Sequence, residues 1–193
     1  MLLKRMSTII EVEIDHGAFK MKDDRAMPMR IAAYNCMEPI LSLLGNRMDS
    51  NQLLQLNNIL CASVPQLDNK GEKKMAKGRV RMDNLGIKDA NQVVRTSAYR
   101  MLTAMCAIHP AALVRNMADV LYAILLTDLK TGTKKTKIIE LKNDNRDEPI
   151  IAAVRLIKSI SEMNGIDGTC FEEYKKKWVC DNQPAIKQLW DNL

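Results

Sequence analysis

The chain has 193 residues, of which 47% are hydrophobic and 27% charged, with a formal net charge of +6. This balance supplies a folded core and excludes a disordered polymer. It also excludes a transmembrane helix, because no stretch approaches the roughly 18 uninterrupted apolar residues that a span needs. Aromatic residues make up only 4%, whereas methionine occurs 13 times. Such straight-chain and small apolar residues suit helix-on-helix packing, so the composition predicts an all-α protein forming one domain over residues 1–193.

The first six residues, Met1 to Met6, are typical of the end of a helix whose beginning is missing. We therefore expect the chain to be a fragment of a longer protein. The segment is too short for a signal peptide. Together with the lack of a membrane span, this predicts a soluble intracellular protein of the cytoplasm and nucleus.

Residues 8–23 have the pattern of a β-hairpin. Apolar Ile10, Val12 and Ile14 alternate with acidic residues, which is the period of a two-faced strand. A glycine-containing turn follows, and residues 18–22 form the returning arm. An isolated two-stranded hairpin is only marginally stable in water, so this one needs a helix surface or a partner to lie against. The hairpin is therefore the first candidate for a binding element.

Eight residues of the hairpin are the expected partner contacts. They are Ile10, Val12, Ile14, His16, Gly17, Phe19, Lys20 and Met21. Phe19 is the expected anchor, because desolvated aromatic side chains tend to dominate interface energy. The alternative is that Phe19 folds back onto the following helix. Both roles are compatible with one hairpin, since alternate side chains of a strand face opposite ways.

The next two elements are predicted to be an antiparallel pair of helices. The first begins near Pro28, after an acidic pair that favours the positive end of the helix dipole, and ends at Gly45. Pro39 inside it predicts a kink or a split. The second begins at Asp49 or Ser50 and repeats leucine on one face. The inward face of the first helix is predicted to be Ile31, Tyr34, Met37, Leu41 and Leu44.

Residues 67–88 lose this periodicity and carry lysine and arginine residues between glycines. Such a stretch is too polar to offset the entropy of ordering it, so we predict an inserted basic mobile loop. Binders of RNA or single strands usually interleave aromatic residues for base stacking, and none occurs at 68–88. Contact with an acidic protein, or plain solvation, is therefore favoured over nucleic-acid binding through Lys70 to Arg81.

The remainder of the chain is predicted to be helical. Helices are expected from Asp89 to His109, from Pro110 to a loop at Thr131–Thr136, from about Pro149 to Met163, from Thr169, and from Gln183 to Trp190. The buried face of the first of these is predicted to be Val94, Ala98, Met101, Leu102 and Met105. Helix pairs that recur at intervals of roughly 35 to 55 residues predict HEAT-like repeats stacked into a short solenoid.

Residue types that catalysis or metal binding needs are scarce. The two histidines, His16 and His109, lie in predicted turns, where surface or capping roles are favoured over catalysis. No phosphate-binding glycine motif is present. The five cysteines are odd in number and lack C-x-x-C spacing, which favours buried free thiols over a disulfide or zinc site. We expect no enzymatic activity, no cofactor and no metal.

The hairpin region also carries a family resemblance. The string EVEIDHGAFKMKDD followed by MRIAAYNCMEPIL resembles the start of the C-terminal domain of the cullin-associated and neddylation-dissociated proteins. That domain is also named for interaction with the TATA-binding protein. The resemblance extends through residues 94–120, 138–160 and 180–193, whereas about 67–89 departs from the family pattern and is predicted to be inserted.

The resemblance implies a fold and a function. In those relatives the domain ends a superhelical protein that wraps an unneddylated cullin, and its hairpin occupies the site of the substrate adaptor. It therefore implies a regulator of cullin-RING ubiquitin ligase assembly that acts by steric competition, with no small-molecule substrate and no membrane. The alternative is a HEAT-type scaffold of another pathway, such as nuclear transport or transcription, in which the hairpin is only structural.

Overall fold

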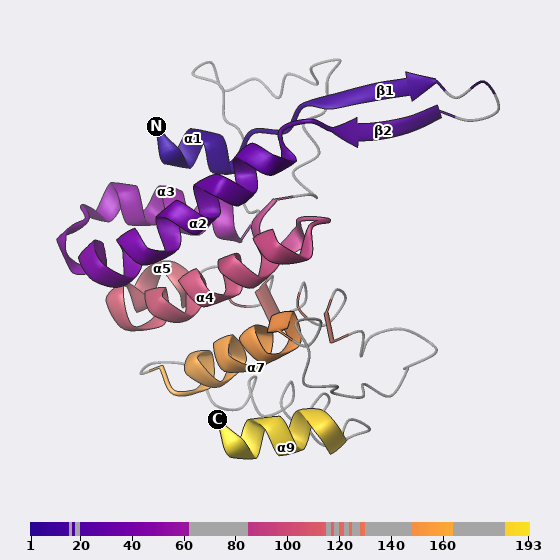
Figure 1. Ribbon diagram of the computed structural model, residues 1–193. Helices are drawn as coiled ribbons and strands as arrows, with labels where there is room; N and C mark the ends of the chain where they lie inside the picture. Colours follow the sequence, from indigo (N-terminus) through magenta and orange to yellow (C-terminus); the bar gives the residue numbers. More distant parts are fainter. Residues whose placement is uncertain are drawn as a thin grey trace.

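The computed structural model describes residues 1–15, 17, 20–61, 85–114, 117, 120–121, 124, 128–129, 148–163 and 184–193. Within these residues the protein is mostly helical, with a two-stranded antiparallel β-hairpin near the N-terminus (Figure 1). The all-α prediction is therefore too narrow, while the hairpin that accompanied it is confirmed. The elements are α1 (Leu2–Met6), β1 (Glu11–Asp15), β2 (Lys20–Asp24), α2 (Met27–Leu44), η1 (Gly45–Arg47), α3 (Ser50–Leu60), η3 (Gly86–Lys88), α4 (Gln92–Ile108), α5 (Pro110–Val114), α7 (Glu148–Ser161) and α9 (Pro184–Asn192).

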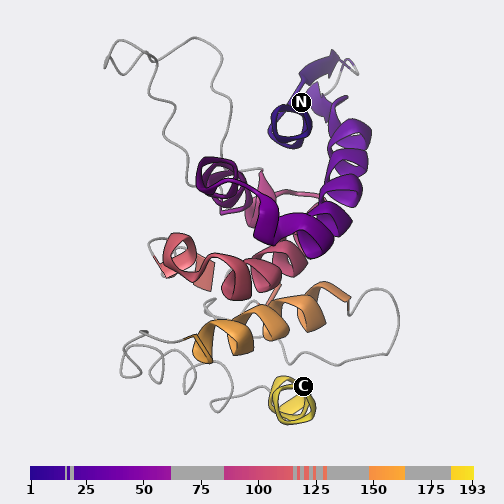
Figure 2. The same cartoon turned by 90° about the vertical axis from the view of Figure 1, so that its left-hand side faces the viewer.

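Four helices stack on one another from the hairpin end to the C-terminus. Helix α4 contacts α2 on one side and α7 on the other, and α9 contacts α7. Helices α3 and α5 lie on one side of this stack, as the turned view in Figure 2 shows. The described ends of the chain therefore lie at opposite ends of the stack (Figure 1).

The core runs along the inner faces of these helices. Every residue predicted for the buried face of α4 is buried, from Val94 to Met105. In α2 the buried face contains Tyr34, Met37 and Leu41, whereas Leu44 is 47% exposed. The prediction for Leu44 is wrong because Leu41 and Gly45 take the inner positions of the last turn. The largest fully buried apolar side chains are Met6, Tyr34, Leu41, Leu56, Leu60, Ile87, Tyr99, Met101, Leu102 and Met105.

Helix ends follow the capping residues, with one correction. Asp49 caps α3, and its carboxylate accepts hydrogen bonds from the amides of Asn51 and Gln52. Helix α4 was predicted to start at Asp89, but its cap is Asn91, whose side chain accepts from the amides of Val93 and Val94. Either side chain can cap a helix. Asp89 is instead turned into the interior.

Helix α2 runs without interruption from Met27 to Leu44 with Pro39 inside it. Of the two outcomes predicted for Pro39, a split helix is therefore wrong. Pro28 lies in the first turn as predicted, where its missing N–H leaves no helical hydrogen bond unmade.

The loop predicted over residues 67–88 is wrong at its C-terminal end. Residues 86–88 form a 3₁₀ turn, and Leu85 and Ile87 are buried. Gly86 has a φ of +54°, and a Cβ added there would lie 2.0 Å from the carbonyl oxygen of Leu60. This close approach to the end of α3 requires glycine. Residues 67–84 lie outside the described residues.

Candidate functional site: the projecting hairpin

The hairpin projects from the end of the helical stack (Figure 1). Strands β1 and β2 pair in antiparallel register, with Glu11 opposite Asp24 and Asp15 opposite Lys20. The ladder begins inside the predicted span of 8–23 and ends one residue beyond it, at Asp24. Gly17 lies in the turn with a φ of +76°, and its amide donates to the Asp15 carboxylate at 2.7 Å.

The two faces of the hairpin differ in polarity. Ile14 pairs with Met21 and Val12 with Asp23, and side chains of paired residues lie on the same face of a sheet. This face is therefore largely apolar. Met21 is 48% exposed, whereas Val12 and Ile14 are half-buried. Ile10, which precedes β1, is 49% exposed.

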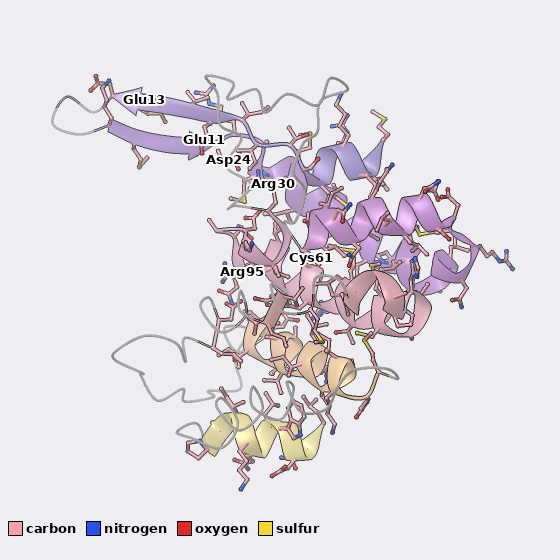
Figure 3. All side chains as sticks on the ribbon, turned by 180° about the vertical axis from the view of Figure 1, so that it is seen from behind. Glu11, Glu13, Asp24, Arg30, Cys61 and Arg95 are labelled. Atoms are coloured by element: carbon pink, nitrogen blue, oxygen red, sulfur yellow. The ribbon has the colours of Figure 1, made fainter. Side chains whose placement is uncertain are left out.

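The opposite face is charged. Glu11, Glu13 and Asp15 are exposed along β1, and the Lys20 ammonium lies 3.0 Å from the Glu13 carboxylate. Figure 3 shows Glu13 farther out along the ribbon than Glu11. The hairpin consequently presents one apolar and one charged surface, as the alternating sequence predicts.

Of the eight expected contact residues, six lie in the described part of the chain. Ile10, Val12, Ile14 and Met21 share the apolar side of the hairpin, Lys20 belongs to the charged face, and Gly17 is in the turn. His16 and Phe19 lie outside the described residues. The role of Phe19 as an anchor stays a prediction.

The foot of the hairpin is held by Asp24 and Arg30. One carboxylate oxygen of Asp24 accepts from the amides of Ile10 at 3.2 Å and Ala26 at 3.0 Å, and the other accepts from the Arg30 guanidinium. Arg30 also donates to the carbonyl oxygen of Thr8 at 3.1 Å. Figure 3 shows Asp24 and Arg30 together at the foot. The Arg30 side chain thus joins the chain entering the hairpin, at Thr8, to the chain leaving it, at Asp24.

Arg30 has a second carboxylate partner from a distant part of the sequence. Its Nε donates to Asp89 Oδ2 at 3.0 Å, and both side chains are buried, with 1% and 0% of their surface exposed. Asp89 also accepts from the amide of Asn91 at 2.8 Å. We call Arg30, Thr8, Asp24 and Asp89 the Arg30 cluster.

The pKa values of the two carboxylates in the Arg30 cluster are shifted in opposite directions. Burial acts to raise the pKa of Asp24, but hydrogen bonds from Arg30 and two backbone amides outweigh it and leave that pKa lowered. Burial also raises the pKa of Asp89, and there the amide of Asn91 and the Arg30 guanidinium offset only part of the increase. The difference follows from position, because Asp24 is 19% exposed and Asp89 is fully enclosed.

A second arginine continues the network into α4. Arg95 makes two hydrogen bonds to the Asp128 carboxylate, at 3.0 and 2.8 Å, and donates to the carbonyl oxygen of Asp89 at 2.8 Å. The hydroxyl of Tyr99 donates to Asp128 at 2.6 Å. A continuous chain of polar contacts therefore leads from the foot of the hairpin, through Asp89, to the middle of the helical stack.

The sequence interpretation missed this network. Arg30 lies four residues before Tyr34, so it occupies the inward face of α2 where a charged residue is unexpected. That position is the signal that was available. Its partner Asp89 is 59 residues away, and no local pattern links the two.

Two surface hollows occur in the part of the chain that the structure describes. They have volumes of about 340 and 370 Å³ and lie between α4 and α7, sharing Thr103. Cys106 lines one of them, and burial raises the pKa of its thiol to about 12, which makes it a poor nucleophile. No group of potential metal ligands occurs among the described residues. Nor is any helix in the described ranges long and apolar enough to cross a membrane.

The cysteines are only partly as predicted. Cys61 is buried and Cys106 half-buried, but Cys36 is exposed on α2. All three are free thiols. The burial predicted for Cys36 is therefore wrong, because Cys36 lies outside the stripe of buried residues on α2 that contains Ala33, Tyr34 and Met37. Cys170 and Cys180 lie outside the described residues.

Neither protein-family models nor curated protein sequences give a match to this chain. The structure alone therefore describes the kind of protein this is. It is a stack of helices from which a two-faced hairpin, tied at its foot by buried charges, projects into solvent.

Proposed function

We propose that this chain is a cullin-binding regulator of cullin-RING ubiquitin ligase assembly, in which the hairpin competes with the substrate adaptor. The observation that carries the proposal is the hairpin, which projects from the helical stack (Figure 1) and on which the apolar side chains of Ile10 and Met21 are exposed. Exposed apolar residues grouped on a projecting element are typical of a contact surface. The hairpin is also the segment with the strongest resemblance to the family.

The helical arrangement supports the same proposal. One hollow is lined by Arg100 and Thr103 of α4 and by residues from the start of α7, and the other by Cys106 and Ala107 of α4 and by residues at and just after the end of α7. The two helices therefore run in parallel. Parallel neighbours with a second layer of helices behind them are expected of helix-pair repeats. We therefore propose that the stack is a short HEAT-like solenoid.

The proposed mechanism is steric competition without chemistry. A cullin held by the hairpin cannot hold its adaptor at the same site, so each ligand weakens the binding of the other by the same coupling free energy. An exchange factor needs only this reciprocity.

The test is competition between this chain and a substrate adaptor for an unmodified cullin. Met21→Asp places a charge on the apolar face at a half-exposed position, and we expect it to weaken displacement by at least about tenfold. The matched control is Glu13→Gln, which alters the charged face and should displace adaptor as the parent does. Equal displacement by Met21→Asp and the parent would overturn the assignment of this face.

A pull-down distinguishes the alternative function. If the chain retains other proteins and no cullin, a scaffold of another pathway is favoured. The half-buried Val12 and Ile14 are the observation that supports this alternative, since a structural hairpin also covers part of its apolar face.

A further inference from the structure

The buried side chain of Arg30 ties the foot of the hairpin to the helices. Arg30 donates to the Thr8 carbonyl and to the Asp24 carboxylate. Thr8 lies just before β1, and Asp24 is the last residue of β2. These are the two points through which the hairpin joins the rest of the molecule. Arg30 itself belongs to α2 and is 1% exposed.

The same guanidinium is fixed from the other side. Asp89, which accepts from its Nε, follows the 3₁₀ turn η3 and belongs neither to the hairpin nor to α2. The backbone of Asp89 is held in turn by Arg95, which is anchored to Asp128. The direction of Arg30 is thus set by α4 and η3 as well as by its own helix.

We propose that Arg30 is the positioning residue of the hairpin: it joins both feet of the ribbon to Asp89 and so fixes the direction in which the apolar face is presented. The role in partner binding rests on the proposed function. The role in holding the hairpin does not. A hairpin held in one direction loses less conformational freedom when it binds, and this preorganisation favours affinity.

Arginine is required here because of its shape. The guanidinium is a flat fork with donors that point in several fixed directions. In this structure Nη1 reaches Thr8 and Asp24, whereas Nε reaches Asp89. A lysine has all its donors on one atom and cannot bridge these separated acceptors, so Arg30→Lys keeps the charge and loses the connection.

Amide hydrogen exchange on the full chain tests the positioning role. We compare the parent with Arg30→Lys and with Asp24→Asn. The asparagine can still accept from the amides of Ile10 and Ala26, but it presents no anion to Arg30. The control is Ile160→Val, a small change at a fully buried position of α7, which loosens the core without touching the hairpin.

We expect the amide of Arg25, which donates to the Ile10 carbonyl across the foot at 3.0 Å, to exchange at least about tenfold faster in Arg30→Lys and in Asp24→Asn, while the amides of Met101 and Met105 in α4 keep their parental rates. In Ile160→Val we expect no increase in exchange at the hairpin beyond any increase measured for the amides of α4. Unchanged hairpin exchange, or an equal increase in α4, would overturn the proposal. If Arg30→Lys fails to fold, Asp24→Asn decides between the same two outcomes.

Adaptor displacement then tests the consequence for binding. Arg30→Lys should need at least about tenfold more protein than the parent to displace adaptor from an unmodified cullin, and Ile160→Val about the same amount as the parent. If a variant with a loosened hairpin displaces adaptor at the same concentration as the parent, the direction of the hairpin does not matter for binding. If the parent binds no cullin, the proposed function fails, and the exchange result still decides the role of Arg30.

Discussion

The hairpin and the helical stack are held by different forces. The helical stack is held by one core of apolar side chains such as Leu102, Met105 and Ile157, all fully buried. At the foot of the hairpin it is made by Arg30 and its acceptors. Apolar burial is strong but has no direction, whereas hydrogen bonds to a planar guanidinium fix an angle. The stack thus provides stability, and the Arg30 cluster provides orientation.

The largest expected effect concerns the boundary between structured and inserted sequence. Deleting residues 67–88 removes the fully buried Ile87 and displaces Asp89, so we expect a loss of at least about 3 kcal/mol in the free energy of unfolding. Deleting only 67–84 with a short glycine linker should change it by less than about 1 kcal/mol. Urea denaturation of both variants measures the difference, and equal losses would show that the turn η3 contributes nothing.

A core truncation should affect stability and leave the hairpin alone. Leu102→Ala removes a fully buried side chain of α4 and should lower the free energy of unfolding by about 3 kcal/mol. Adaptor displacement at a temperature where the variant stays folded should match that of the parent. Displacement that falls along with stability would contradict the separation of the two regions.

A change at the turn of the hairpin should do the opposite, weakening binding and leaving stability intact. Phe19→Ala should weaken cullin binding by about 2 kcal/mol, roughly thirtyfold, if the ring is an anchor. Because the ring can instead brace the hairpin on α2, circular dichroism and melting temperature must stay close to those of the parent. A folded variant that displaces adaptor as well as the parent does would remove Phe19 from the interface. Deleting residues 15–20 then decides whether the turn matters at all.

The smallest effect expected is in the pH dependence of stability. The lowered pKa of Asp24 means that its contribution is complete above the pKa of the unfolded state, about 3.9, and is lost as the pH falls through the folded-state value. Asp24→Asn should therefore be less stable than the parent near pH 6, with the difference narrowing toward pH 2. Denaturation midpoints at several pH values measure it. A constant difference would mean that the ionised form of Asp24 does not matter.

Local patterns were enough to predict most elements. The alternation from Ile10 to Ile14, the cap at Asp49 and the break between His109 and Pro110 each appear where expected. The buried face of α4 was also predictable because its spacing matches one side of a helix. These features depend on neighbours only a few residues away.

What could not be predicted depends on distant contacts. Nothing near Asp89 shows that it binds Arg30 and leaves the cap to Asn91. The apolar side chains of Ile40 and Leu43 are also exposed, Leu43 to 81%, although hydrophobicity alone would place them inside. For the candidate site, the two faces of the hairpin followed from the sequence, but its attachment did not.

The contact between Gly86 and the Leu60 carbonyl brings the start of η3 against the end of α3. The chain leaves α3 and returns to η3 at the same place. We expect this contact to be kept when sequence is inserted between the two elements, because the entropy of closing a loop rises only slowly with its length. A fluorescent protein inserted between residues 70 and 80 would therefore report where this chain binds in a cell, with the hairpin and the helical stack unaltered.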